Sequence, residues 1–153
     1  MKTWSDRFVV GDEMALFNQV KEVVCRLPEY KLGKKEDGQE VELSCHLLAR
    51  AVSQVFGLKY CEGHLCPSYN HSWVEMPSGH IIDLYPVGII GGPVLWVKTW
   101  NAPAERYFTE EKLGGQSTGE DQPWFKWAIK LLVRRLRSVK KEIEKERSGE
   151  NGL

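Results

Sequence analysis

The stretch from Ser44 to Leu84 decides the fold, because it joins a helix pattern to a hairpin pattern. Its two halves are SCHLLARAVSQVFG at residues 44–57 and HSWVEMPSGHIIDL at residues 71–84. In the first half, apolar residues recur at helical spacing between Ser44, a typical N-cap, and Gly57, a typical helix end. In the second half, two strand-like runs flank the turn formers Pro77-Ser78-Gly79. The sequence therefore predicts a helix and then an antiparallel hairpin, with bounds 44–56, 71–76 and 80–85.

Three chemically active residues fall at defined places in these elements. Cys45 lies in the first turn of the predicted helix, where free backbone N–H groups and the helix dipole favour a thiolate. His71 and Asp83 lie in the two strands, six residues either side of a turn centre at about 77, so we expect their side chains on one face. A thiol nucleophile needs a base, and that base needs a group to orient it. Cys45, His71 and Asp83 are therefore the candidate catalytic residues.

The same residues carry a resemblance to a known family. The segments are CHLLARA at 45–51, HSWVE at 71–75 and GHIID at 79–83. A helix-borne cysteine, a strand histidine and an aspartate of the next strand, in this order, resemble the transglutaminase-like group of the papain-like cysteine enzyme superfamily. The resemblance covers about 42–86, a little over a quarter of the chain. It implies an α+β fold in which an antiparallel sheet packs on a central helix that bears the cysteine.

The resemblance also implies a reaction. Cys45 would attack an acyl carbon and form a thioester, His71 would exchange protons with the thiol and the leaving group, and Asp83 would orient the imidazole. We expect a thiol hydrolase acting on amide bonds of a peptide, protein or small amide, with no cofactor. Transfer to an amine instead of water would give crosslinking or acetylation. Gln39, six residues before the cysteine, has a spacing similar to that of the papain-type oxyanion glutamine.

The sequence also predicts the positions of three residues near this triad, Trp73, His46 and His80. Trp73 shares a strand face with His71, either as a wall of the substrate site or as packing within the sheet. His46, the residue after Cys45, is expected to point elsewhere on the helix. His80 is expected at the surface.

Two alternatives to an active enzyme stay open at this point. Cys61, His64 and Cys66 cluster closely in sequence, and a histidine or cysteine of the candidate site could complete a tetrahedral zinc site. Their spacing, Cys-x-x-His-x-Cys, matches no common zinc finger. The second alternative is an inactive interaction domain of the same fold, because a fold alone does not establish catalysis.

The rest of the chain predicts further elements around this centre. Residues 1–119 are expected to form the catalytic domain, and 120–147 a C-terminal helix with Asp121 as its cap and Pro123 in its first turn. The smaller segments are a helix at 12–27, a surface loop at 31–41, short strands at 58–62 and 94–99, a Gly-rich linker at 113–119 and a disordered tail at 148–153.

The C-terminal helix combines a heptad seam with a basic bias. The seam residues are Phe125, Ile129, Leu132, Leu136, Val139 and Ile143. We expect the first half of the helix to pack on the domain and residues 134–147 to project or to pair with another helix, for example in a homodimer. Residues 121–147 hold nine Lys or Arg against four Asp or Glu. The interspersed glutamates argue against a nucleic-acid partner.

The composition is that of an ordinary globular domain and suggests a location but no partner. The 153 residues include 21 Lys or Arg and 21 Asp or Glu, so the formal net charge is zero. No run approaches the roughly 18 to 20 apolar residues that a membrane span needs, and we expect no secretory signal. Four cysteines without an export signal favour reduced thiols in a cytoplasmic protein.

Overall fold

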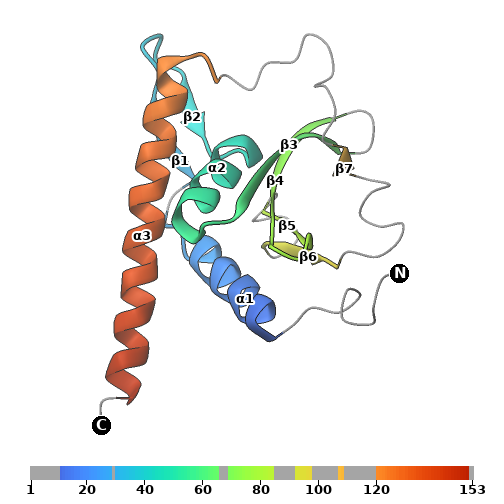
Figure 1. Cartoon of the computed structure of the whole chain (residues 1–153). Helices are drawn as coiled ribbons and strands as arrows, with labels where there is room; N and C mark the ends of the chain where they lie inside the picture. The colour runs from blue at the N-terminus through green and yellow to red at the C-terminus, as the bar shows by residue number, and fades with distance from the viewer. Residues whose placement is uncertain are drawn as a thin grey trace.

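The fold is α+β, with a central helix between a sheet and a long C-terminal helix. The structure, a computed structural model, describes residues 11–28, 30–65, 69–84, 92–97, 107–108 and 120–151. Helix α2 (Cys45–Phe56) packs against the sheet on one side and against α3 (Pro123–Asn151) on the other (Figure 1). The predicted class, an antiparallel sheet on a cysteine-bearing helix with a long C-terminal helix, is confirmed at this level.

The main sheet has five antiparallel strands in the described part of the chain. Their order is β6-β5-β4-β3-β7, which places β4 at the centre. Their bounds are β3 (Lys59–Leu65), β4 (Tyr69–Glu75), β5 (Ile81–Asp83), β6 (Val94–Trp96) and β7 (Tyr107–Phe108). The strands expected at 58–62 and 94–99 and the expected hairpin are therefore present, with shifted ends.

The β4–β5 hairpin turns at Ser78, one residue later than the sequence suggests. The backbone N–H of Met76 donates to the carbonyl of His80 at 2.9 Å, and Gly79 has a φ of 93°, which a glycine adopts readily. Val74 pairs with Ile82, and extending this register places position 83 opposite position 73. His71 and Asp83 are thus diagonal neighbours on one face and not directly opposite each other.

Helix α2 begins and ends at the predicted residues. The Ser44 hydroxyl accepts a hydrogen bond from the Leu47 N–H at 3.3 Å, and Gly57 adopts the left-handed conformation that ends the helix. The helix buries Cys45, Leu47, Leu48, Ala49, Ala51 and Val52 between the sheet on one side and α3 on the other. Because both ends and both of these sides are fixed, the first turn with Cys45 is held in a defined position against the sheet.

The two faces of the sheet bury different sets of residues. On the side of the helices, Val74, Ile82 and Leu84 join a large core with α1 (Gly11–Cys25), α2 and α3. On the opposite side, Cys61, Trp73 and Ile81 form a small cluster against which Trp96 packs. His71 and Asp83 have the same strand parity as this second cluster.

Residues 31–41 are not the surface loop that their polarity suggests. They contain β1 (Lys31–Lys34) and the start of β2 (Glu40–Glu42), which pair as an antiparallel hairpin beside α3 (Figure 1). Each strand buries one apolar residue, Leu32 in β1 and Val41 in β2. A strand with one buried residue has too little alternation for its pattern to predict it.

Helix α3 packs along the domain for most of its length. Five seam residues are buried within the chain: Phe125, Leu132, Leu136, Val139 and Ile143. Ion pairs continue the contact with α1, from Arg147 to Glu22 at 2.7 Å and from Arg26 to Glu146 at 2.8 Å. Of the two expectations for residues 134–147, projection is therefore wrong, and pairing with another helix fits, the partner being α1 of the same chain. The helix continues to Asn151 through most of the expected disordered tail.

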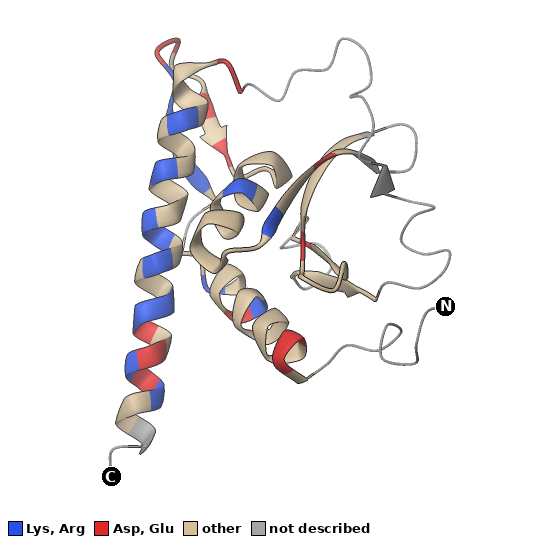
Figure 2. Ribbon diagram, viewed as in Figure 1, with Lys and Arg blue, Asp and Glu red and all other residues tan. Residues whose placement is uncertain are grey.

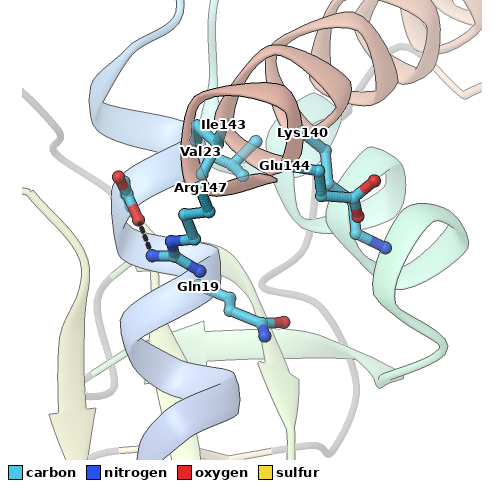
Figure 3. Close-up of a pocket in the computed structure, with 7 residues that line it drawn as sticks. Gln19, Val23, Lys140, Ile143, Glu144 and Arg147 are labelled. Carbon is cyan, nitrogen blue, oxygen red and sulfur yellow. Dashed lines mark hydrogen bonds and ion pairs between the residues drawn. The ribbon is translucent and has the colours of Figure 1, made fainter. Parts of the chain in front are cut away.

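The homodimer prediction depended on an exposed apolar seam, and this seam is buried within the chain. The dimer itself stays a prediction. Most Lys and Arg residues of α3 are exposed, and Figure 2 shows their positions along the helix. A small pocket lies between α1 and α3, where Gln19, Val23, Lys140 and Arg147 line it (Figure 3). None of the candidate catalytic residues lines this pocket.

Two further points concern expectations from the sequence. His80 is buried with 1% exposure, not at the surface, and its Nε2 lies 4.0 Å from Glu13 Oε2, which also accepts the Ser78 hydroxyl at 2.5 Å. No helix in the described ranges is both long and apolar enough to cross a membrane. The expected linker at 113–119 lies outside the described residues.

Candidate active site

Cys45 is the first residue of α2 and is buried, with 8% exposure. The four N–H groups of a helix's first turn have no acceptor within the helix, so they create a positive potential at this end. The Ser44 cap uses one of them, the Leu47 N–H. The local sequence thus places the thiol of Cys45 at the positive end of the central helix, where a thiolate is favoured.

His71 and Asp83 form a buried pair across β4 and β5. The Nε2 atom of His71 lies 3.0 Å from both carboxylate oxygens of Asp83. Trp73 stacks on the imidazole, with ring centroids 6.0 Å apart and an angle of 26° between the planes. The predicted pairing on one sheet face is confirmed. Because Nε2 faces the carboxylate, Nδ1 is the nitrogen left to face Cys45.

The electrostatics of Cys45 and His71 match an ion pair. Burial raises the pKa of the Cys45 thiol, but hydrogen bonds and charge from His46 and His71 outweigh burial and lower it to about 6. Burial lowers the pKa of His71, but the Asp83 carboxylate and Cys45 outweigh burial and raise it to about 9. Between these values Cys45 is a thiolate and His71 an imidazolium.

His46 does not point away from the site as the sequence suggests. Its Nδ1 lies 2.8 Å from the hydroxyl of Ser72, and its ring hydrogen-bonds the Cys45 side chain. Ser72 lies between His71 and Trp73 on β4, and the alternation of the strand turns it toward α2. The thiol therefore has an imidazole from each of two elements. The sequence signal that could have predicted this role of His46 is its position in the first turn of a helix that faces a strand with a serine.

Two further expected site residues, Gln39 and Trp73, have other positions. Gln39 is exposed at the β1–β2 turn, where its backbone N–H donates to Asp37 at 2.9 Å. It is not among the residues that the structure brings to the thiol. Trp73 is 1% exposed, so its ring packs on His71 inside the sheet cluster and offers almost no surface to a substrate. Of the two interpretations of Trp73, packing fits the structure.

The zinc alternative involves residues that the structure describes only in part. Cys66 and the side chain of His64 lie outside the described residues. The pKa of Cys61 is raised to about 12 by burial and by the Glu75 carboxylate, whereas zinc binds the thiolate form. Within the described ranges, no group of three or more His, Cys, Asp or Glu could hold a metal ion.

Comparisons with known proteins give no match. No protein-family model, no curated protein and no solved structure matches this chain. The interpretation of the site therefore depends on its own residues.

Proposed function

We propose that this protein is a cysteine-dependent acyl-transfer enzyme that hydrolyses amide bonds through Cys45, His71 and Asp83. The observation that carries the proposal is the His71 imidazole, held at 3.0 Å by both oxygens of Asp83 and hydrogen-bonded to a thiol with a pKa of about 6. A histidine fixed in this way keeps one nitrogen for the nucleophile, as a thiol hydrolase requires. A buried thiol without a catalytic role needs no such arrangement.

The geometry supports a sequence of two acyl transfers. The Cys45 thiolate attacks the acyl carbon, and the developing oxyanion lies near the N-terminus of α2, where the Cys45 backbone N–H is the first candidate donor. His71 Nδ1 then gives its proton to the leaving nitrogen, and a thioester forms. Water attacks the thioester, gives its proton back to His71 and releases the acid. Asp83 orients the ring throughout.

We also propose a fold family and a cellular compartment for the protein. The helix-borne cysteine, the central strand with the histidine and the next strand with the aspartate fit a transglutaminase-like version of the papain-like fold. Cys25, Cys45 and Cys61 are free thiols, which suits a reducing compartment such as the cytoplasm. The substrate is an amide of a peptide, a protein or a small molecule.

Trapping the thioester tests the proposal. The protein is mixed with p-nitrophenyl acetate, a small acyl donor suited to a buried thiol, and each cysteine peptide is analysed by mass spectrometry. We expect one acetyl group on Cys45, lost on adding hydroxylamine, and a strongly reduced rate in His71→Gln. Cys25→Ser, which removes an exposed thiol, is the matched control and keeps the full rate. Acetylation of Cys25 as fast as Cys45 would rule out an activated site.

A further inference from the structure

A chain of hydrogen bonds leads from His46 into the space between α2 and the sheet. His46 Nδ1 lies 2.8 Å from the Ser72 hydroxyl, which lies 3.1 Å from the Tyr60 hydroxyl. Tyr60 donates to Glu62 Oε2 at 2.9 Å. The chain runs on the helix-facing side of β3 and β4, opposite the face that carries His71 and Asp83. The thiol of Cys45 thus meets two histidines that are supported from opposite sides of the sheet.

The chain is anchored by Arg50 of α2. Its guanidinium donates to Glu62 Oε2 at 2.9 Å and to the backbone carbonyl of His46 at 2.8 Å, and it lies 4.4 Å from the centre of the Tyr60 ring. The side chains of Arg50 and Glu62 are 13% and 19% exposed, so the pair is largely shielded from water. The guanidinium also pairs with Glu120. Glu62 Oε2 accepts from Arg50 and from the Tyr60 hydroxyl, so this oxygen is an acceptor on both sides.

The carboxylate fixes the direction of every bond in the chain. Tyr60 has one hydroxyl proton and gives it to Glu62, so its oxygen accepts the proton of Ser72. The Ser72 oxygen must then accept from His46, which places a proton on His46 Nδ1. A neutral imidazole carries one N–H, so Nε2 of His46 has a free lone pair. This nitrogen is a base.

We propose that His46 is a second catalytic histidine, whose Nε2 takes the thiol proton of Cys45 while the His71–Asp83 pair supplies the proton of the leaving group. This inference deepens the proposed function and rests on it. The two roles separate because Asp83 favours the protonated form of His71, whereas the Ser72 chain presents His46 as a neutral acceptor. Once His46 holds the thiol proton, its charge lies beside the thiolate, which is the direction in which His46 changes the pKa of Cys45.

The proton transfers balance over one turnover. As the thiolate of the resting site forms, the S–H bond of Cys45 breaks and an N–H bond forms on His46 Nε2, while His46 Nδ1 keeps its N–H bond and donates to Ser72. The sulfur bonds to the acyl carbon, the C–N bond breaks, and the leaving nitrogen takes the proton of His71 Nδ1. Water returns a proton to His71 as its oxygen attacks the thioester. The sulfur leaves as a thiolate and shares the proton of His46 again.

Nitrogen NMR of the histidine rings tests the inference without any catalytic assay. In ¹⁵N-labelled protein, two-bond ¹H–¹⁵N correlation spectra distinguish the Nδ1–H from the Nε2–H tautomer, and His46→Gln assigns the signals. We expect neutral His46 in the wild type to carry its proton on Nδ1. In Tyr60→Phe, Ser72 can turn its proton toward Nδ1, so the population moves toward Nε2–H. Tyr30→Phe is the matched control, because Tyr30 is 51% exposed, and it leaves the tautomer unchanged.

Two NMR results would overturn the inference. One is an Nε2–H tautomer in the wild type, which leaves no lone pair for the thiol proton. The other is an unchanged Nδ1–H tautomer in Tyr60→Phe, which would show that the chain does not set the protonation. Both outcomes are independent of the proposed function, because no substrate is involved.

The pH profile of Cys45 acetylation separates the two proposals. In His46→Gln we expect the midpoint of the rate to rise by about one unit or more, which at pH 6 slows acetylation by about fivefold or more. An unchanged midpoint in His46→Gln, with a raised midpoint in His71→Gln, overturns the role of His46 and leaves the triad intact. A wild-type midpoint near the ordinary value of 9.0 overturns the proposed function itself. If His46→Gln does not fold, the wild-type tautomer decides.

Discussion

The folded structure changes the reactivity of Cys45 in a way that depends on pH, and the effect has a defined size. The thiol pKa is lowered from 9.0 to about 6 in the folded protein. At pH 6 the folded thiol is about half ionised and the unfolded thiol about 0.1%, a ratio of about 500. A less basic thiolate is a weaker nucleophile, and a Brønsted coefficient of about 0.4–0.5 over three units reduces the ratio by about 20-fold. Folding therefore accelerates the reaction about 20-fold at pH 6.

The same arithmetic predicts that this advantage disappears at higher pH. At pH 8 the folded thiol is almost fully ionised and the unfolded thiol about 10%, so the ionisation ratio falls to about 10. The weaker nucleophilicity then makes the folded protein about twofold slower, and the two rates cross between about pH 7 and 8. These ratios count ionisation and nucleophilicity alone. Burial of Cys45 lowers the folded rates by one further factor at all pH values, which moves the crossing to lower pH and leaves the change of the ratio with pH intact.

A small disulfide such as 4,4′-dithiodipyridine is a suitable probe. Native and urea-unfolded protein are labelled for short times from pH 5 to 9. Trypsin separates the Cys45 peptide, which ends at Arg50, from the peptide 60–98, in which fragmentation distinguishes Cys61 from Cys66. Cys61, with its pKa raised to about 12, is the internal control and stays unlabelled in native protein across this range. A ratio of native to unfolded rates that is constant with pH would refute the lowered pKa of Cys45.

Two further predictions concern stability. The pKa of His71 is raised from 6.5 to about 9, so its pairing with Asp83 stabilises the fold fully below pH 6.5 and less as pH rises through 9. In urea unfolding, the free-energy difference between wild type and Asp83→Asn should fall by on the order of 2 kcal/mol between pH 6 and 10, and a constant difference contradicts the pairing. Leu136→Ala should lower the free energy of unfolding by about 2–5 kcal/mol, against less than about 0.5 kcal/mol for exposed Arg137→Ala. A melting temperature of the wild type that depends on protein concentration would indicate a dimer.

The central part of the fold could be predicted from local signals. Ser44, the apolar stripe and Gly57 define α2, because a cap, a buried face and a left-handed end are all encoded by residues close together. The pairing of His71 with Asp83 followed from strand parity, which survives a change of register by two residues. The exact centre of the turn did not follow, because it depends on which backbone groups close a three-residue loop.

The remaining features depend on tertiary contacts that leave little trace in the sequence. The heptad seam of α3 specifies a buried stripe but not its partner, which is α1 and α2 of the same chain. The β1–β2 hairpin is polar because only Leu32 and Val41 face the core. The position of His46 depends on Ser72, 26 residues away, and on the side of the sheet that α2 covers. A single sequence does not specify that contact.

The pH dependence of thioester formation on Cys45 tests the central claim most directly. The rate of acetylation by p-nitrophenyl acetate, followed by mass spectrometry of the Cys45 peptide, should rise with a midpoint at about 6 and fall with a midpoint at about 9, as the thiolate forms and the imidazolium is lost. Asp83→Asn should move the upper midpoint down, because it removes the carboxylate that favours the imidazolium. A single rise near pH 9 without a plateau at neutral pH would contradict the account.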